Sequence, residues 1–149
     1  MRARCFTVGV FQDVPSADRG LEALARHGFA AESLTVLAKD AADVRLLINR
    51  HLRGAPDLLA IEGLGSVAVR GPLIETLQGS DGYLVARGLA RSIGRAGFQK
   101  HDGQIFERLT ARGGVLVAIH NEPRAAEALA TLHAYGGGNA AIGAWTGRL

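Results

Sequence analysis

Three arginines recur at intervals of four residues in a segment that is predicted to be helical, Gly82–Ala96. At 100° per residue, Arg87, Arg91 and Arg95 fall within about 80° of one another around the helix axis. Guanidinium groups bind phosphate and carboxylate through paired hydrogen bonds. The spacing predicts an anion-binding ridge for lipid headgroups, nucleic acid or an acidic partner. The alternative is an ordinary solvated helix face. No aromatic residues alternate with the arginines, which argues against stacking with single-stranded nucleic acid, and we do not expect a nucleic-acid partner.

Two of the five histidines are placed where a metal or acid–base site is conceivable. His101 opens a predicted helix beside Asp102, and that helix leads into a strand that ends at His120. The chain contains no H-E-x-x-H motif and no histidine pair at helical i,i+4 spacing. The sequence therefore leaves a His101/His120 site as a hypothesis, without showing that the two meet. We predict no catalytic residue and no cofactor.

A glycine-rich stretch, GLGSVAVRGPL at residues 63–73, has the spacing of a dinucleotide-binding turn. Such a turn needs a helix to begin at the loop, so that its amides meet the pyrophosphate. Pro72 would break that helix, and Ser66–Arg70 alternates β-branched residues as strands do. We therefore predict a tight turn with close backbone packing and no bound nucleotide.

Two segments of the chain read alike, at about residues 6–38 and 114–145. Each has a Val-rich strand, a turn with proline, a helix containing Glu-Ala-Leu-Ala and a glycine stop, followed by a second strand. For the second unit the last strand is expected at Asn139–Trp145. A strand–helix–strand unit places its two strands parallel. Two such units predict an α+β ferredoxin-like sandwich.

The residues between the two units, 40–113, are too many for a plain loop and are expected to form a helical insert within a single domain of residues 1–149. Ala41–Leu52 is predicted to be a helix with Asp40 as its N-cap. Gly82–Ala96 and His101–Arg112 are predicted as two more. A further helix is expected to start at Pro72.

Composition places the chain among globular proteins of one domain. Its 149 residues are 48% apolar and 21% charged, with a formal net charge of +3. The single cysteine, Cys5, excludes an intramolecular disulfide, and we expect a cytoplasmic protein. We expect neither a signal peptide nor a transmembrane segment.

Several stretches are similar to a known family. GVFQDVPSADRGLEALARHGF, GLGSVAVRGPL and GFQKHDGQIFERLTARGGVLVAIH resemble, in order, segments of the small bacterial general-stress, or heat-induced stress protein-like, domain family. The resemblance implies a bacterial protein without established enzymatic activity. The chain departs from the family in a shorter, more basic central region and in having Phe106 where an aromatic Tyr pair is common.

The leading hypothesis is therefore a non-enzymatic, stress-related binding or interaction protein. Because open sheets leave edge strands that need cover, we also expect a homodimer or larger homo-oligomer. The two alternatives are an anion or lipid-surface binder that uses the arginine ridge, and a small-molecule enzyme around His101 and His120.

Overall fold

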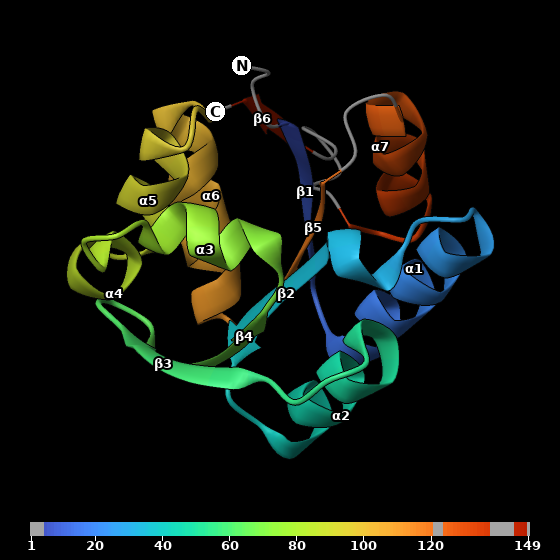
Figure 1. Cartoon of the computed structure of the whole chain (residues 1–149), viewed down its shortest axis with the longest axis horizontal. Coiled ribbons are helices and arrows are strands. Elements are labelled where there is room, and N and C mark those ends of the chain that lie inside the picture. Colours follow the sequence, from blue (N-terminus) through green and yellow to red (C-terminus); the bar gives the residue numbers. More distant parts are fainter. Residues whose placement is uncertain (1–4, 121–123, 138–144, 149) are drawn as a thin grey trace.

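Six strands form one antiparallel sheet through the middle of the molecule (Figure 1). The computed structural model describes residues 5–120, 124–137 and 145–148. In chain order the strands are β1 (Cys5–Phe11), β2 (Leu34–Lys39), β3 (Asp57–Ile61), β4 (Gly65–Arg70), β5 (Val115–His120) and β6 (Trp145–Arg148). Across the sheet they run β3-β4-β2-β5-β1-β6.

The strand–helix–strand units are interleaved. Helix α1 (Val14–Arg26) connects β1 to β2, and β5 lies between these two strands, antiparallel to both. Strands β1 and β2 are therefore parallel to each other, as the crossover predicted. Helix α7 (Ala125–Ala134) follows β5, and β6 pairs with the far side of β1. The predicted strand Asn139–Trp145 lies, apart from Trp145, outside the described residues.

Helices cover both faces of the sheet (Figure 1). Strand β5 is buried along Val115–Ile119, and its side chains alternate between two separate hydrophobic clusters. One cluster is covered by α1, α2 (Ala42–Leu52) and α7. The other is covered by α3 (Pro72–Gln78), α4 (Tyr83–Arg87), α5 (Leu89–Arg95) and α6 (Lys100–Ala111).

The predicted helical insert also contains strands. Residues 40–113 contribute helices α2 to α6, but they include a hairpin, β3–β4, which extends the sheet beyond β2. Gly63 and Gly65 have φ of 85° and 80° in the hairpin turn, a backbone region that favours glycine. The tight turn is therefore confirmed, and a strand, not a phosphate-binding helix, follows it.

Helix ends follow the local sequence in most places. Asp13 caps α1 by accepting a hydrogen bond from the Ser16 backbone N–H at 2.9 Å. The expectation that Asp40 caps α2 is wrong, because Ala41 holds that position and the Asp40 carboxylate instead binds Arg45 at 2.7 Å. Helix α6 begins and ends within one residue of its predicted bounds.

The Asp13 cap gives a pH-dependent prediction. The hydrogen bond from Ser16 lowers the pKa of the Asp13 carboxyl below its ordinary value of 3.8. The ionised cap therefore stabilises the fold fully above that ordinary value, and the stabilisation is lost as pH falls through the lowered pKa. We expect Asp13→Ala to lower Tm near neutral pH, with a difference from wild type that shrinks in strong acid. Asp13→Asn keeps the acceptor and serves as the control in thermal unfolding followed by circular dichroism.

Candidate functional site

The predicted arginine ridge does not lie on one helix. The expectation of a continuous helix over Gly82–Ala96 is wrong, because the chain breaks at Gly88, where α4 ends and α5 begins. Gly88 has a φ of 89°, and a Cβ there would lie 3.0 Å from the carbonyl oxygen of Glu62. The break thus allows close contact with the end of β3, and it removes the helical register on which the ridge was predicted.

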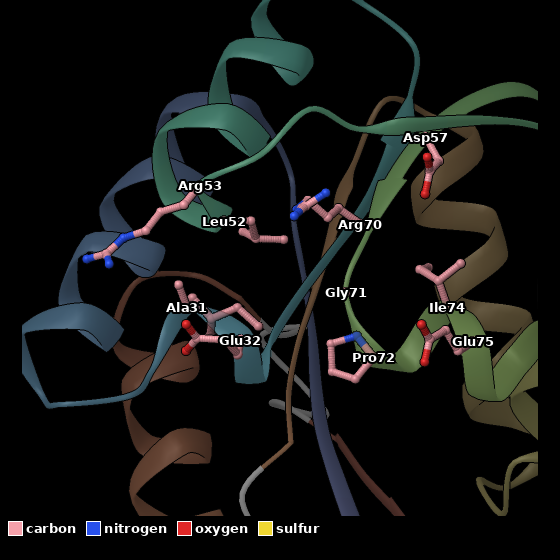
Figure 2. A pocket seen from close by; sticks show the side chains of 11 residues that line it. Ala31, Glu32, Leu52, Arg53, Asp57, Arg70, Gly71, Pro72, Ile74 and Glu75 are labelled. Carbon is pink, nitrogen blue, oxygen red and sulfur yellow. The ribbon is translucent and has the colours of Figure 1, made fainter.

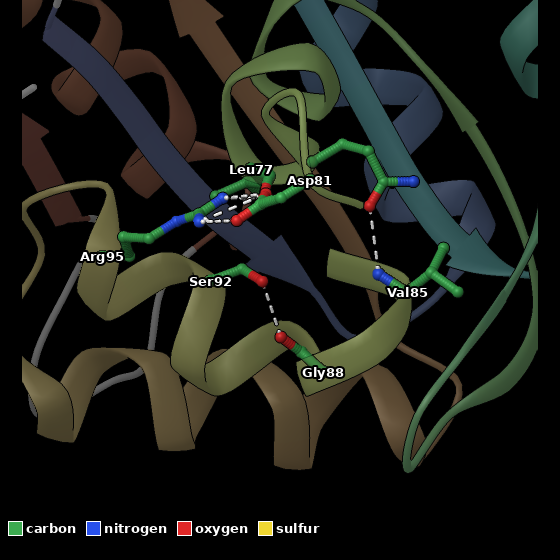
Figure 3. A network of polar contacts seen from close by, with 7 residues as sticks. Leu77, Asp81, Val85, Gly88, Ser92 and Arg95 are labelled. Carbon is green, nitrogen blue, oxygen red and sulfur yellow. Dashed lines mark hydrogen bonds and ion pairs between the residues drawn. The ribbon is translucent and has the colours of Figure 1, made fainter. Parts of the chain in front are cut away.

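The Arg95 side chain contacts other residues of the protein (Figure 3). Its guanidinium stacks 3.7 Å from the ring centre of Tyr83 and pairs with Asp81, the closest N–O distance being 3.0 Å. It also donates a hydrogen bond to the Leu77 carbonyl at 3.2 Å. The hydrogen bond from Arg95 lowers the pKa of the Asp81 carboxyl. Arg95 therefore ties α5 to the end of α3 and the start of α4.

The other two arginines of the ridge remain available. Arg87 and Arg91 are exposed, and neither has an ion pair or hydrogen bond with the residues that the structure describes. Arg87 lies in the last turn of α4 and Arg91 in the first turn of α5. An anion-binding surface therefore stays a prediction, now resting on these two side chains.

The two histidines have different surroundings. His120 is half-buried at the end of β5, opposite Phe6 of β1, and their rings stack with centroids 4.8 Å apart. His101 is exposed in the first turn of α6. Within the described ranges, no hydrogen bond or ring contact joins the two histidines, and no group of three or more His, Cys, Asp or Glu side chains is arranged to hold a metal. A His101/His120 site therefore stays a prediction.

A pocket of about 500 Å³ opens at one end of strands β2, β3 and β4, between the two layers of helices (Figure 2). Its walls come from the short 3₁₀ helix η1 (Ala31–Ser33), the C-terminal end of α2, the ends of β3 and β4, and the start of α3. The lining combines buried apolar residues with charged groups: Leu34, Leu52 and Ile74, and Glu32, Arg53, Asp57, Arg70 and Glu75.

Glycine and threonine fix the wall formed by β4 and α3. Gly71 has a φ of 125°, and a Cβ there would lie 2.4 Å from the Leu34 carbonyl oxygen, so the chain passes directly against β2. The buried Thr35 hydroxyl accepts a hydrogen bond from the Leu73 backbone N–H at 3.0 Å. These contacts hold Arg70 and Pro72 at the pocket, and the GP dipeptide in the sequence was the signal for this turn.

A second, smaller pocket of about 320 Å³ shares Glu32, Leu34 and Arg53 with the first. Its wall includes His51, whose Nε2 lies 2.6 Å from Oδ1 of Asp18, so the pair joins α2 to α1. The sequence carries no signal for this pair or for the pocket, because their residues lie far apart in the chain and share no motif.

Comparison with known proteins finds no matching family model, curated protein or solved structure. Among the described residues, no helix is both long enough and apolar enough to cross a membrane.

The unequal roles of the arginines can be measured by thermal unfolding. Arg95→Ala removes the stack on Tyr83 and the hydrogen bond to Leu77, so we expect it to destabilise the fold by roughly 1 kcal/mol. Arg87→Ala and Arg91→Ala are the matched controls, and each should stay within about 0.5 kcal/mol of wild type, as surface substitutions usually do. Equal effects of all three substitutions would contradict this assignment.

Proposed function

We propose that the chain is a non-enzymatic binding and interaction protein that assembles into a homodimer through strand β3. The observation that carries the proposal is the place of this strand at the end of the sheet order, where it pairs with β4 on one side only. The unpaired backbone groups of an edge strand can pair with another strand. The hairpin β3–β4 of the insert pairs with β2 and covers that side of the sheet, which leaves β3 as the edge strand.

The side chains of β3 favour association. Leu58 is 50% exposed, and Ala60, on the same face, is exposed as well. Leu59 and Ile61 point to the opposite face, toward the cluster covered by α3 to α6. Lys and Pro, which protect many edge strands from pairing, are absent from Asp57–Ile61. An apolar side chain on an unprotected edge gains burial when a second strand covers it.

The charge pattern of β3 permits pairing with a second copy of itself. In an antiparallel pair centred on Leu59, Asp57 of each copy lies opposite Ile61 of the other, and Leu58 lies opposite Ala60. No like charges then face each other across the interface, which would destabilise the pair. Such an arrangement has the two-fold symmetry of most homodimers.

We further propose that β1, β2, β5 and β6, with α1 and α7, form a ferredoxin-like unit. Support comes from the strand order β2-β5-β1-β6 and from the interleaving of the two strand–helix–strand units. The stress-related role is also a proposal, supported by the resemblance of the glycine-rich and Val-rich stretches to the general-stress family.

The assembly is tested by analytical ultracentrifugation. We expect the wild-type protein to sediment as a dimer at micromolar concentration, and Leu58→Lys to sediment as a monomer, because the lysine places a charge at the pairing edge. Thermal unfolding should show that the variant remains folded, since a half-exposed side chain is replaced.

Leu46→Lys is the matched control. Leu46 is 71% exposed on α2, outside the edge strand, so the same change in charge and size there should leave the dimer intact. A wild-type protein that sediments as a monomer would overturn the proposal. So would equal dissociation of both variants, because the loss would then reflect net charge and not strand β3.

A further inference from the structure

Arg70 places a positive charge without a counter-ion at the larger pocket. The side chain is half-buried, and its one polar contact with a described residue is the hydrogen bond that Nη1 donates to the Ala55 carbonyl at 3.1 Å. No described carboxylate lies within salt-bridge distance of it. A half-buried guanidinium keeps several N–H donors, and a carboxylate can accept two of them in a charge-assisted pair, so it favours an anionic group brought by a ligand.

The backbone holds this guanidinium in place. The group lies against Gly54, where a Cβ would come within 2.4 Å of the Arg70 Cζ. Gly54 follows Arg53, the one described non-glycine residue with a positive φ, at 55°. This left-handed residue ends α2 and turns the chain so that Gly54 and Ala55 meet Arg70. The guanidinium thus already lies at the pocket in the ligand-free chain.

Carboxylates occupy the other walls of the pocket. Glu32, Asp57 and Glu75 line it, and none of their three carboxylates has a hydrogen bond or ion pair with a described residue. In Figure 2, the Glu75 side chain lies beside Pro72 and Asp57 lies across from Arg70, whereas the Arg53 side chain points away from Arg70. The three carboxylates thus share the pocket lining with Arg53 and Arg70, around an apolar floor formed by Leu34, Leu52 and Ile74.

This arrangement discriminates between classes of ligand. A simple anion would meet Arg70 but would also face three carboxylates, which repel it. A simple cation would meet the carboxylates but would face the fixed guanidinium. A molecule with a carboxylate at one end, an ammonium at the other and an apolar part between them can pair with the guanidinium and with the carboxylates of the pocket at the same time. The cavity of about 500 Å³ lies in the size range of small-molecule sites.

We propose that this pocket binds a small zwitterion of the dipeptide class. Arg70 binds the ligand's carboxylate, Glu75 and Asp57 bind its ammonium group, and an aliphatic side chain rests on Leu52 and Ile74. The site adjoins the dimer edge proposed above, because Asp57 begins β3 and also lines the pocket. Ligand binding needs only the pocket walls of one chain and does not depend on the pairing of β3 with a second copy.

The proposal is tested by titrating the full chain with glycyl-L-leucine, followed by two-dimensional NMR of backbone amides. Two capped forms provide matched probes: N-acetylglycyl-L-leucine lacks the ammonium group, and glycyl-L-leucinamide lacks the carboxylate. We expect shifts of amides around residues 31–34, 52–57 and 70–75. We expect each capped form to bind about tenfold more weakly, which corresponds to one lost charge-assisted hydrogen bond.

Variants separate the charge of Arg70 from its position. Arg70→Gln should weaken glycyl-L-leucine about tenfold. Gly54→Ala keeps the charge but forces the guanidinium to move, so it should also weaken binding, and thermal unfolding should show little loss of stability because a flexible side chain can shift. Arg108→Gln is the control, because this exposed arginine on α6 is not among the residues that line the pocket and should leave affinity unchanged.

Several results would overturn the proposal. One is the absence of any pocket shift at saturating peptide. Another is equal affinity for the free and capped peptides, or for wild type and Arg70→Gln. Tighter binding of inorganic phosphate than of glycyl-L-leucine would assign the pocket to simple anions instead. Because Leu58→Lys leaves the pocket walls intact, failure of dimerisation and failure of peptide binding can be told apart by titrating that variant.

Discussion

Strand β5 must bury both of its faces, and the arrangement of the helices follows from this requirement. Its residues Val115–Ile119 are apolar without interruption, so neither face of the strand can be left to water. Helices α1 and α7 of the strand–helix–strand units, together with α2, cover one face. The remaining face would stay exposed if residues 40–113 were a plain connection. The insert folds back over it with α3 to α6, and this second layer also forms a wall of the larger pocket.

Turns and helix ends could be predicted from the sequence wherever they depend on residues close together in the chain. The turn at Gly63 and Gly65, the start of α3 at Pro72 and the bounds of α6 follow from residue types that act over a few positions. The hairpin was missed as an element because β3 is a short apolar run that a helical insert could equally contain. The break at Gly88 was missed because its cause, the carbonyl of Glu62, is distant in sequence.

The arginines show why the candidate site could not be predicted. Three arginines with the same chemistry have different surroundings in the fold. Arg95 joins helices, Arg91 is exposed and Arg70 faces a pocket. Helical spacing predicts on which face of a single helix a residue lies. It cannot predict which side chains form ion pairs or hydrogen bonds with other parts of the fold. The pocket is formed by residues 31–34, 52–57 and 70–75, whose proximity depends on Gly71 passing against β2. That approach is a property of the folded sheet.

The pairing pattern of the sheet also determines the order in which it can assemble. Strand β5 pairs with β2, from which residues 40–113 separate it in the sequence, and with β1, from which it is separated by an even longer stretch. These central pairings must therefore close long loops. The hairpin β3–β4, with its three-residue turn, closes a much shorter loop and therefore costs less conformational entropy. It is the part of the sheet best suited to form early, and it carries the apolar edge at Leu58. During refolding, the strands that order first thus also expose an unpaired, apolar edge. Chains can associate through this edge, so the yield of folded protein will fall as chain concentration rises.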